Sequence, residues 1–147
     1  MRTLLLTSAF LLALAAAPDA HAQGGFGIGA QIGDPTGLAL KIGQGAGSFD
    51  FAAGTDFDER LDLQGHYLIA DRRLATQGAV VRGFFGPGAF VATRPDRNTR
   101  AGLSFNFGLG FYPAREFEIF GQVTPQLQLT DQTDVGVGAA LGLRFYP

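Results

Sequence analysis

The chain has 147 residues, 11 basic and 13 acidic side chains and a net charge of −2, and its 16% of charged residues is below the roughly 25% of a soluble domain. This balance gives no basic patch for nucleic acid, and the absence of cysteine excludes a disulfide framework and thiolate metal sites. Glycine and phenylalanine are abundant instead, with 22 and 14 residues.

The first 22 residues have the pattern of a secretory signal peptide. Arg2 precedes an apolar stretch over residues 4–17, and Ala20 and Ala22 form an A-x-A cleavage site. The apolar stretch is too short for a membrane anchor helix. We therefore expect residues 1–22 to be removed and residues 23–147 to form a single exported domain.

Eight later segments alternate bulky apolar residues with small or polar residues, as β-strands with two different faces do. They cover residues 26–33, 38–43, 49–57, 61–70, 79–93, 101–112, 116–129 and 134–147. Turn sequences separate them, among them residues 34–37 (Asp-Pro-Thr-Gly) and the arginine pair at 72–73. The pattern predicts an all-β protein, an eight-stranded antiparallel up-and-down transmembrane β-barrel.

The composition of the two rows indicates which row faces the interior. In residues 101–112, for example, Leu103 and Phe107 alternate with Ser104 and Gly108. The interior of an eight-stranded barrel is only just wide enough for side chains, so the small row belongs inside and the bulky row faces lipid. Alternation alone does not fix this direction, and a secreted soluble barrel of the lipocalin kind, which binds lipid, is an alternative.

The inward row also carries charges, which must be paired inside a narrow lumen. We predict an internal charge network of Lys41, Asp50, His66, Arg82, Glu118 and Arg144. Further polar lumen positions are expected at Gln64, Asn106, Gln122 and Gln126. We interpret the network as a polar plug that fills the barrel, with a gate or narrow ion path as the alternative.

His66 is the only histidine of the exported part. A lipid A deacylase would need a His-x-Ser pair with an acidic partner, because its nucleophile requires a base within reach. Tyr67 and Leu68 follow His66, so this pair is missing. Metal-ligand spacings and phosphate-binding loops are missing too. We therefore predict a non-catalytic protein without a cofactor or a metal.

Three stretches carry a resemblance to a known family. They are residues 33–41 (Gly-Asp-Pro-Thr-Gly-Leu-Ala-Leu-Lys), 117–125 (Phe-Glu-Ile-Phe-Gly-Gln-Val-Thr-Pro) and 143–146 (Leu-Arg-Phe-Tyr). With them the chain resembles small eight-stranded bacterial outer-membrane β-barrels of unassigned function, akin to the transmembrane domain of OmpA and to OmpX. The resemblance implies inward-facing Lys41 and Glu118. The chain departs from the family pattern at Gln122, where a second acidic residue is expected, and at Pro147, where such barrels usually end in an aromatic residue.

These features predict a monomer in the outer membrane of a Gram-negative bacterium, with both chain ends on the periplasmic side. Its expected partners are outer-membrane lipid and, during biogenesis, the barrel-assembly machinery and periplasmic chaperones. Phe145 is the candidate assembly signal, displaced from the chain end. We expect a structural or envelope role, with a narrow pore or small-solute channel as the alternative.

Overall fold

The computed structural model describes residues 25–43, 45–55, 60–75, 78–94, 97–130 and 132–147. The predicted signal peptide, residues 1–22, lies outside the described residues. Within the described part, no helix is long and apolar enough to cross a membrane.

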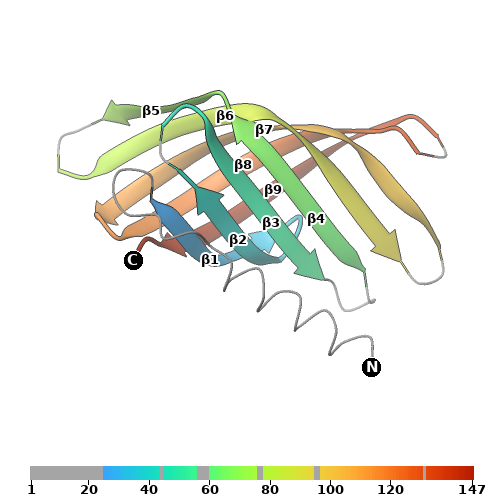
Figure 1. The fold of residues 1–147 in the computed structure, drawn as a ribbon, viewed down its shortest axis with the longest axis horizontal. Helices are drawn as coiled ribbons and strands as arrows, with labels where there is room; N and C mark the ends of the chain where they lie inside the picture. The colour runs from blue at the N-terminus through green and yellow to red at the C-terminus, as the bar shows by residue number, and fades with distance from the viewer. Residues whose placement is uncertain (1–24, 44, 56–59, 76–77, 95–96, 131) are drawn as a thin grey trace.

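Nine strand segments follow one another along the described chain (Figure 1). They are β1 (Phe26–Gly33), β2 (Gly37–Ile42), β3 (Ser48–Thr55), β4 (Leu61–Leu68), β5 (Ala70–Ala75), β6 (Val80–Arg94), β7 (Arg97–Ala114), β8 (Phe117–Gln128) and β9 (Asp134–Phe145). The eight predicted segments correspond to all of these except β5, with ends that differ by a few residues.

The strands form one closed sheet. Its order is β4-β3-β2-β1-β9-β8-β7-β6-β5, and an additional pairing of β4 with β6 joins the two sides. All pairings are antiparallel, and β4 and β5 both pair with β6 as two parts of one longer strand. Eight antiparallel strands therefore close into a β-barrel, which confirms the predicted all-β, eight-stranded antiparallel barrel architecture.

β5 shows that the turn predicted at Arg72 and Arg73 is wrong. Both arginines lie within the strand, opposite Gly83 and Arg82 of β6. The chain does not turn there because its pairing with β6 continues to Ala75. An arginine pair is polar enough to suggest a turn, but here the hydrogen bonds to β6 keep the backbone in an extended strand conformation.

A β-bulge separates β4 from β5. His66 lies opposite Gly88, whereas Ala70 lies opposite Phe85, so the register shifts by one residue between the two pairs. The shift reverses the alternation of the strand, because side chains point to opposite faces with a period of two. Asp71 is consequently buried inside the barrel, and the next residue along the chain is exposed.

The two faces of the barrel wall have opposite character. Along β8, Phe117 and Ile119 are exposed while Glu118 and Phe120 are buried. Among the described residues, 24 large apolar side chains are exposed, whereas the buried set holds 14 polar or charged and nine apolar residues. This is the reverse of a water-soluble domain, in which large apolar side chains gather inside.

Glycines on the inward row make room for large inward side chains. A Cβ added at Gly142 would lie 2.5 Å from Cζ of Phe120, and one at Gly27 would lie 2.5 Å from Cε1 of Tyr146. Each ring therefore lies against a glycine of a neighbouring segment. In this way the narrow lumen accommodates aromatic rings together with charged side chains.

Candidate functional site in the barrel lumen

Three charged side chains meet across the lumen, and we call them the Arg144 cluster: Asp50, Glu118 and Arg144. The Arg144 guanidinium donates through one NH2 group to Asp50 Oδ1 at 2.7 Å and through the other to Glu118 Oε1 at 3.1 Å. Their side chains are 4%, 0% and 0% exposed. Glu118 lies directly opposite Arg144 in the sheet, but β1 and β2 separate Asp50 from Arg144. The second bond therefore spans the lumen.

Amide side chains extend this cluster to a further strand. Asn106 Nδ2 on β7 donates to Asp50 Oδ2 and to Gln122 Oε1, both at 3.1 Å. Asn106 is fully buried, and β4 and β6 separate it from Asp50 along the wall. Side chains from β3, β7, β8 and β9 thus meet at one level, where they fill the cross-section with hydrogen-bonded atoms.

Aromatic side chains complete the surroundings of the cluster. The Arg144 guanidinium lies over the Phe120 ring, 3.8 Å from its centroid. Tyr112 donates its hydroxyl hydrogen to Glu118 Oε2 at 2.9 Å, and Tyr146 donates to the same oxygen. Glu118 therefore accepts three hydrogen bonds, as a fully buried carboxylate requires.

A second group of charges, which we call the Lys41 cluster, consists of Lys41, Asp71 and Arg82. Lys41 Nζ donates to Asp71 Oδ2 at 2.8 Å, and Arg82 Nε donates to Asp71 Oδ1 at 2.7 Å. Arg82 also donates to the backbone carbonyl of Asp71 at 3.0 Å. Lys41 lies over the Phe84 ring, 5.0 Å from its centroid.

The two clusters balance each other in charge. The Arg144 cluster has two carboxylates and one cation, and the Lys41 cluster has two cations and one carboxylate. Lys41 lies directly opposite Asp50 in the pairing of β2 with β3, so the clusters are adjacent. Their sum is neutral, which is the condition under which buried charges are tolerated.

His66 makes a contact that the sequence order concealed. Its Nε2 shares a hydrogen bond of 2.8 Å with Ser104 Oγ on β7. Gly88 of β6 lies between the two strands and leaves space for the imidazole ring. Both partners are buried inside the barrel, at 4% and 7% exposure. Asp50 lies opposite His66 in the sheet, but its two carboxylate oxygens accept hydrogen bonds from Arg144 and Asn106. The pair is a packed hydrogen bond of the lumen wall, and no acidic side chain of the described residues hydrogen-bonds to His66 as the third member of a catalytic triad would.

The predicted site residues fall into three groups. Seven of the polar positions are at most 6% exposed and lie inside the barrel: Lys41, Asp50, Gln64, Asn106, Glu118, Gln122 and Arg144. His66 is buried as well but hydrogen-bonds to Ser104 and to no charged member of the network. Arg82 and Gln126 are half-buried, and Phe145 is 49% exposed on the outward face.

Asp71 is the functional residue that sequence reasoning missed. It provides the only carboxylate of the Lys41 cluster, but a strict alternation from β4 places Arg72 on the inward row instead. The available signal was the charge count, because three predicted cations faced only two predicted carboxylates. Tyr112 and Tyr146 were also missed. Neither carries a charge, and each belongs to the site only because its hydroxyl group donates to Glu118 Oε2.

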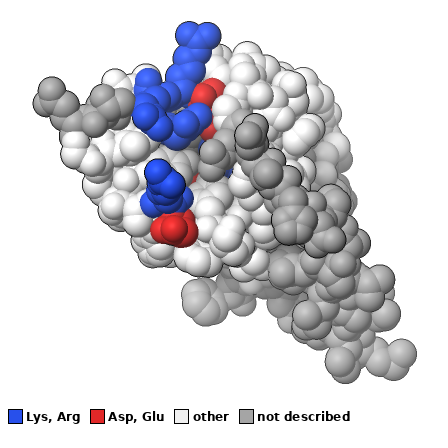
Figure 2. Space-filling view, turned by 60° about the vertical axis from the view of Figure 1, so that its left-hand side comes forward, with Lys and Arg blue, Asp and Glu red and all other residues white. Residues whose placement is uncertain are grey.

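On one face of the molecule, charge gathers in a small area. Figure 2 shows Lys and Arg atoms gathered in one region with a few acidic atoms beside them, whereas most of the other described surface in view carries no charge. Among the described residues, Arg72, Arg73 and Arg115 are exposed. Among the described residues, no group of three or more His, Asp and Glu side chains is placed to hold a metal ion.

No protein-family model, curated protein or solved structure matches the chain. The geometry of the barrel and its lumen is therefore the basis on which function is inferred.

Proposed function

We propose that the protein is a non-catalytic β-barrel of a bacterial outer membrane, with a structural or envelope role and a lumen closed by ion pairs. The observation that carries the proposal is the reversed distribution of side chains. The outward row exposes large apolar residues such as Ile32, Leu141 and Val137, at 68%, 63% and 69%. Arg144 of β9 and Glu118 of the neighbouring strand β8 point inward, both at 1% exposure or less.

Lipid is the surrounding that suits this distribution. In water, every exposed apolar side chain costs free energy, at about 25 cal/mol per Å² of apolar surface. In a bilayer the same surface is at no disadvantage, and a closed barrel satisfies all backbone hydrogen bonds without an exposed sheet edge. The resemblance of residues 33–41 and 117–125 to small outer-membrane barrels agrees with this proposal.

Membrane fractionation tests this placement. We expect the exported protein to sediment with outer membranes, to stay there after an alkaline wash, and to require detergent for extraction. The folded barrel should migrate differently on a gel before and after boiling, because a closed barrel resists detergent until it is heated. A protein that stays in solution without detergent would contradict the membrane proposal and favour the soluble lipid-binding alternative.

The soluble alternative requires an apolar cavity inside the barrel. The interior instead carries the Arg144 and Lys41 clusters, and 14 of the buried described residues are polar or charged. A fatty acid inside would have to lie against ion pairs without compensation. We therefore place this alternative below the membrane barrel.

A plugged lumen is the second element of the proposal. The hydrogen bonds from Arg144 and Asn106 to Asp50 join opposite walls, so the path along the axis is occupied by side chains. The rival function, a narrow pore, is favoured by a cavity of about 650 Å³ between the ends of β1 and β4, lined by Asp34, Arg60 and Asp62 among others. This cavity reaches only one end of the barrel.

Planar-bilayer conductance separates a plug from a pore. We expect no steady channel from the wild-type protein, and a steady channel when Arg144→Ala and Glu118→Ala are combined, because this pair of changes removes two of the large side chains that bridge the lumen. Arg115→Ala, at an exposed arginine outside the lumen, is the matched control and should stay closed. Steady conductance of the wild-type barrel would contradict the plug.

Assembly into the membrane would involve Phe145 as a recognition signal for the barrel-assembly machinery, after periplasmic chaperones have carried the unfolded chain. Phe145 is exposed on the outward row of β9 and lies opposite Ile28 and Phe117. Phe145→Ala should lower the amount of assembled barrel in cells more than Leu143→Ala, a change on the same outward row. Equal amounts of the two variants would argue against a special role of Phe145.

A further inference from the structure

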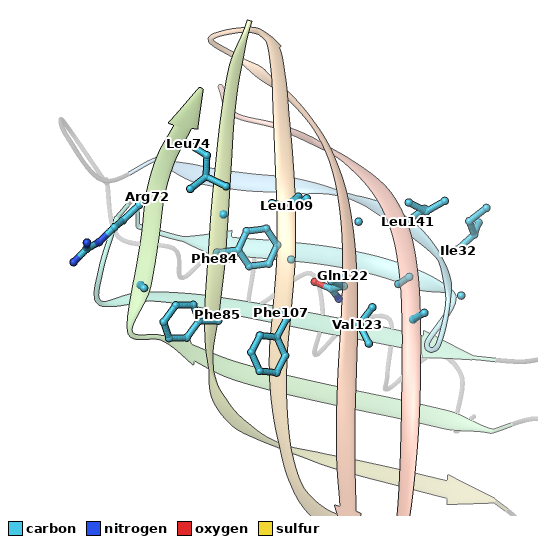
Figure 3. Close-up of a pocket in the computed structure, with 17 residues that line it drawn as sticks. Ile32, Arg72, Leu74, Phe84, Phe85, Phe107, Leu109, Gln122, Val123 and Leu141 are labelled. Atoms are coloured by element: carbon cyan, nitrogen blue, oxygen red, sulfur yellow. The ribbon is translucent and has the colours of Figure 1, made fainter. Parts of the chain in front are cut away.

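A long apolar groove crosses the outer face of the barrel. Its volume is about 1200 Å³, and it runs over β5, β6, β7, β8, β9 and the end of β1. Figure 3 shows Arg72 at one end and Ile32 at the other, with Leu109 and Val123 between them. The groove lies on the face where large apolar residues are exposed, outside the lumen.

Two outward glycines lie in the floor of the groove, where they make room for neighbouring leucine side chains. Gly83 and Gly121 both lie opposite Leu109 of β7, so a row across the sheet alternates between no side chain and a leucine. A Cβ at Gly83 would lie 2.9 Å from Leu74 Cδ1, and one at Gly121 would lie 3.0 Å from Leu141 Cδ2. The leucine ends lean over the glycines, while Phe85, Phe107 and Val123 line one side of the groove (Figure 3).

The direction of the groove suits an acyl chain. Its path from β5 to β1 crosses five strand spacings, which is about 24 Å at about 4.8 Å per spacing. Strands of such barrels tilt by about 45°, so a groove across them is also oblique to the membrane. One leaflet takes up about half of the roughly 30 Å hydrocarbon core, so a line inclined by about 45° crosses it over a length of about 21 Å. The groove is therefore about as long as the hydrocarbon part of one leaflet.

Arg72 gives the groove a charged end. It lines the groove, is exposed, and makes no ion pair with any carboxylate of the described residues. It lies near the end of β5, at the end of the barrel where Phe26 and Phe145 also lie. Arg73 is exposed beside it, so the local charge is positive. An arginine at a membrane interface attracts anionic head groups.

We propose that this groove binds one anionic phospholipid, with an acyl chain along Gly83 and Gly121 and the phosphate paired with Arg72. The proposal rests on the membrane placement proposed above, because only a barrel in lipid presents this face to acyl chains. A second copy of the barrel would fit the apolar groove as well, but two facing copies would bring their unpaired arginines into the same interface, which is unfavourable.

Native mass spectrometry from lipid nanodiscs tests the proposal directly. The discs contain equal amounts of phosphatidylglycerol, which is anionic, and phosphatidylcholine, which is neutral overall. We expect one phosphatidylglycerol to remain on the released wild-type barrel, and Arg72→Gln to lower its retention about fivefold, as expected for one interfacial arginine. The pair Gly83→Leu and Gly121→Leu fills the groove and should lower the retention of both lipids.

Matched variants control for charge and bulk. Arg115→Gln removes an exposed arginine elsewhere, and Gly65→Leu fills a smaller outward pocket of about 330 Å³ on β4. Both should retain phosphatidylglycerol like the wild type. Equal retention of the two lipids by the wild-type barrel, no effect of Arg72→Gln, or a lipid-free dimer that Gly83→Leu and Gly121→Leu abolish would each overturn the proposal.

Insertion is measured first, by gel migration before and after boiling. A wild-type protein that does not enter the discs contradicts the membrane placement itself, and the groove proposal falls with it. A barrel that inserts but retains no lipid leaves the membrane placement standing and contradicts the groove alone.

Discussion

The Arg144 and Lys41 clusters consist of the same kinds of group but differ in how they are held. In the Arg144 cluster the guanidinium and the Glu118 carboxylate are both 0% exposed, and Asp50 is reached from the opposite wall. In the Lys41 cluster Arg82 is 21% exposed and comes from the strand next to Asp71. The Arg144 cluster is thus a link across the lumen. In the Lys41 cluster the pair of Arg82 with Asp71 is local and reaches solvent, whereas the buried Lys41 comes to Asp71 from the non-neighbouring strand β2.

This difference determines what each charge contributes. A buried ion pair gains little over apolar packing, but the loss of one partner leaves an uncompensated charge in a medium that cannot solvate it. When a partly exposed arginine is removed, water can take its place and hydrogen-bond to the carboxylate that it leaves. We therefore expect the loss of Arg144 to be far more damaging than the loss of Arg82, although each has two hydrogen-bond contacts to its cluster's acidic residues.

Arg144→Gln should have the largest effect of all single changes in the lumen. It leaves Asp50 and Glu118 buried without their cation, and we expect a loss of about 3–5 kcal/mol in the free energy of unfolding. Urea titration of the barrel refolded into thin-bilayer vesicles measures this, with the folded fraction read from gel migration and circular dichroism.

A combined variant separates charge from volume. Arg144→Met together with Asp50→Asn and Glu118→Gln removes the buried charges of both signs, and stability should recover by at least half of the single-variant loss. A single Arg144→Gln within about 1 kcal/mol of the wild type would show that the cross-lumen link contributes little.

Asp71→Asn should have the next largest effect, because it removes the one carboxylate of the Lys41 cluster. Lys41 is 1% exposed, but Asp50 lies opposite it in the sheet and retains part of the attraction. We expect a loss of about 2–3 kcal/mol in the same urea titration, below the range for a buried charge with no other partner. Asp134→Asn, at an exposed carboxylate, is the control and should stay within about 0.5 kcal/mol. An equal loss of stability in both variants would contradict the role of Asp71 as the stabilising carboxylate of the Lys41 cluster.

The sequence predicted the barrel because the strand pattern is local. Side chains of a strand alternate with a period of two, so Leu143 and Arg144 alone already show which row is apolar. The eight segments follow from this period, and the inward position of Lys41, Asp50, Glu118 and Arg144 follows once the row of small residues is placed in the narrow interior.

The partners of these residues could not be predicted in the same way. Which side chains meet across the lumen depends on the register between strands that are not neighbours, and the link from Asp50 to Arg144 joins residues 94 positions apart. The bulge before Asp71 was also hidden, because one extra residue in a strand has no strong sequence signal. The pair of His66 with Ser104 needs Gly88 on the strand between them.

Gly142→Ala tests the aromatic support of the Arg144 cluster. The added methyl would lie 2.5 Å from Cζ of Phe120, the ring over which the Arg144 guanidinium lies at 3.8 Å, and 2.6 Å from the backbone oxygen of Ala30. We expect a loss of about 1–3 kcal/mol, as for overpacking elsewhere. Gly136→Ala on the same strand meets no atom within 4 Å and should change stability by less than about 0.5 kcal/mol. If both variants behave alike, the ring does not hold the guanidinium in place.

Arg82→Gln should have the smallest effect of the series. Asp71 keeps Lys41 at 2.8 Å, and water can reach the position of a side chain that is 21% exposed, so about 1 kcal/mol is expected in the urea titration. Salt gives an independent measurement, because screening acts on exposed pairs and much less on buried ones. The difference between wild type and Arg82→Gln should shrink in high salt, whereas the difference for Arg144→Gln should persist. If Arg82→Gln is as damaging as Arg144→Gln at every salt concentration, exposure does not rank the two clusters, and the Lys41 cluster is as much a link of the lumen as the Arg144 cluster.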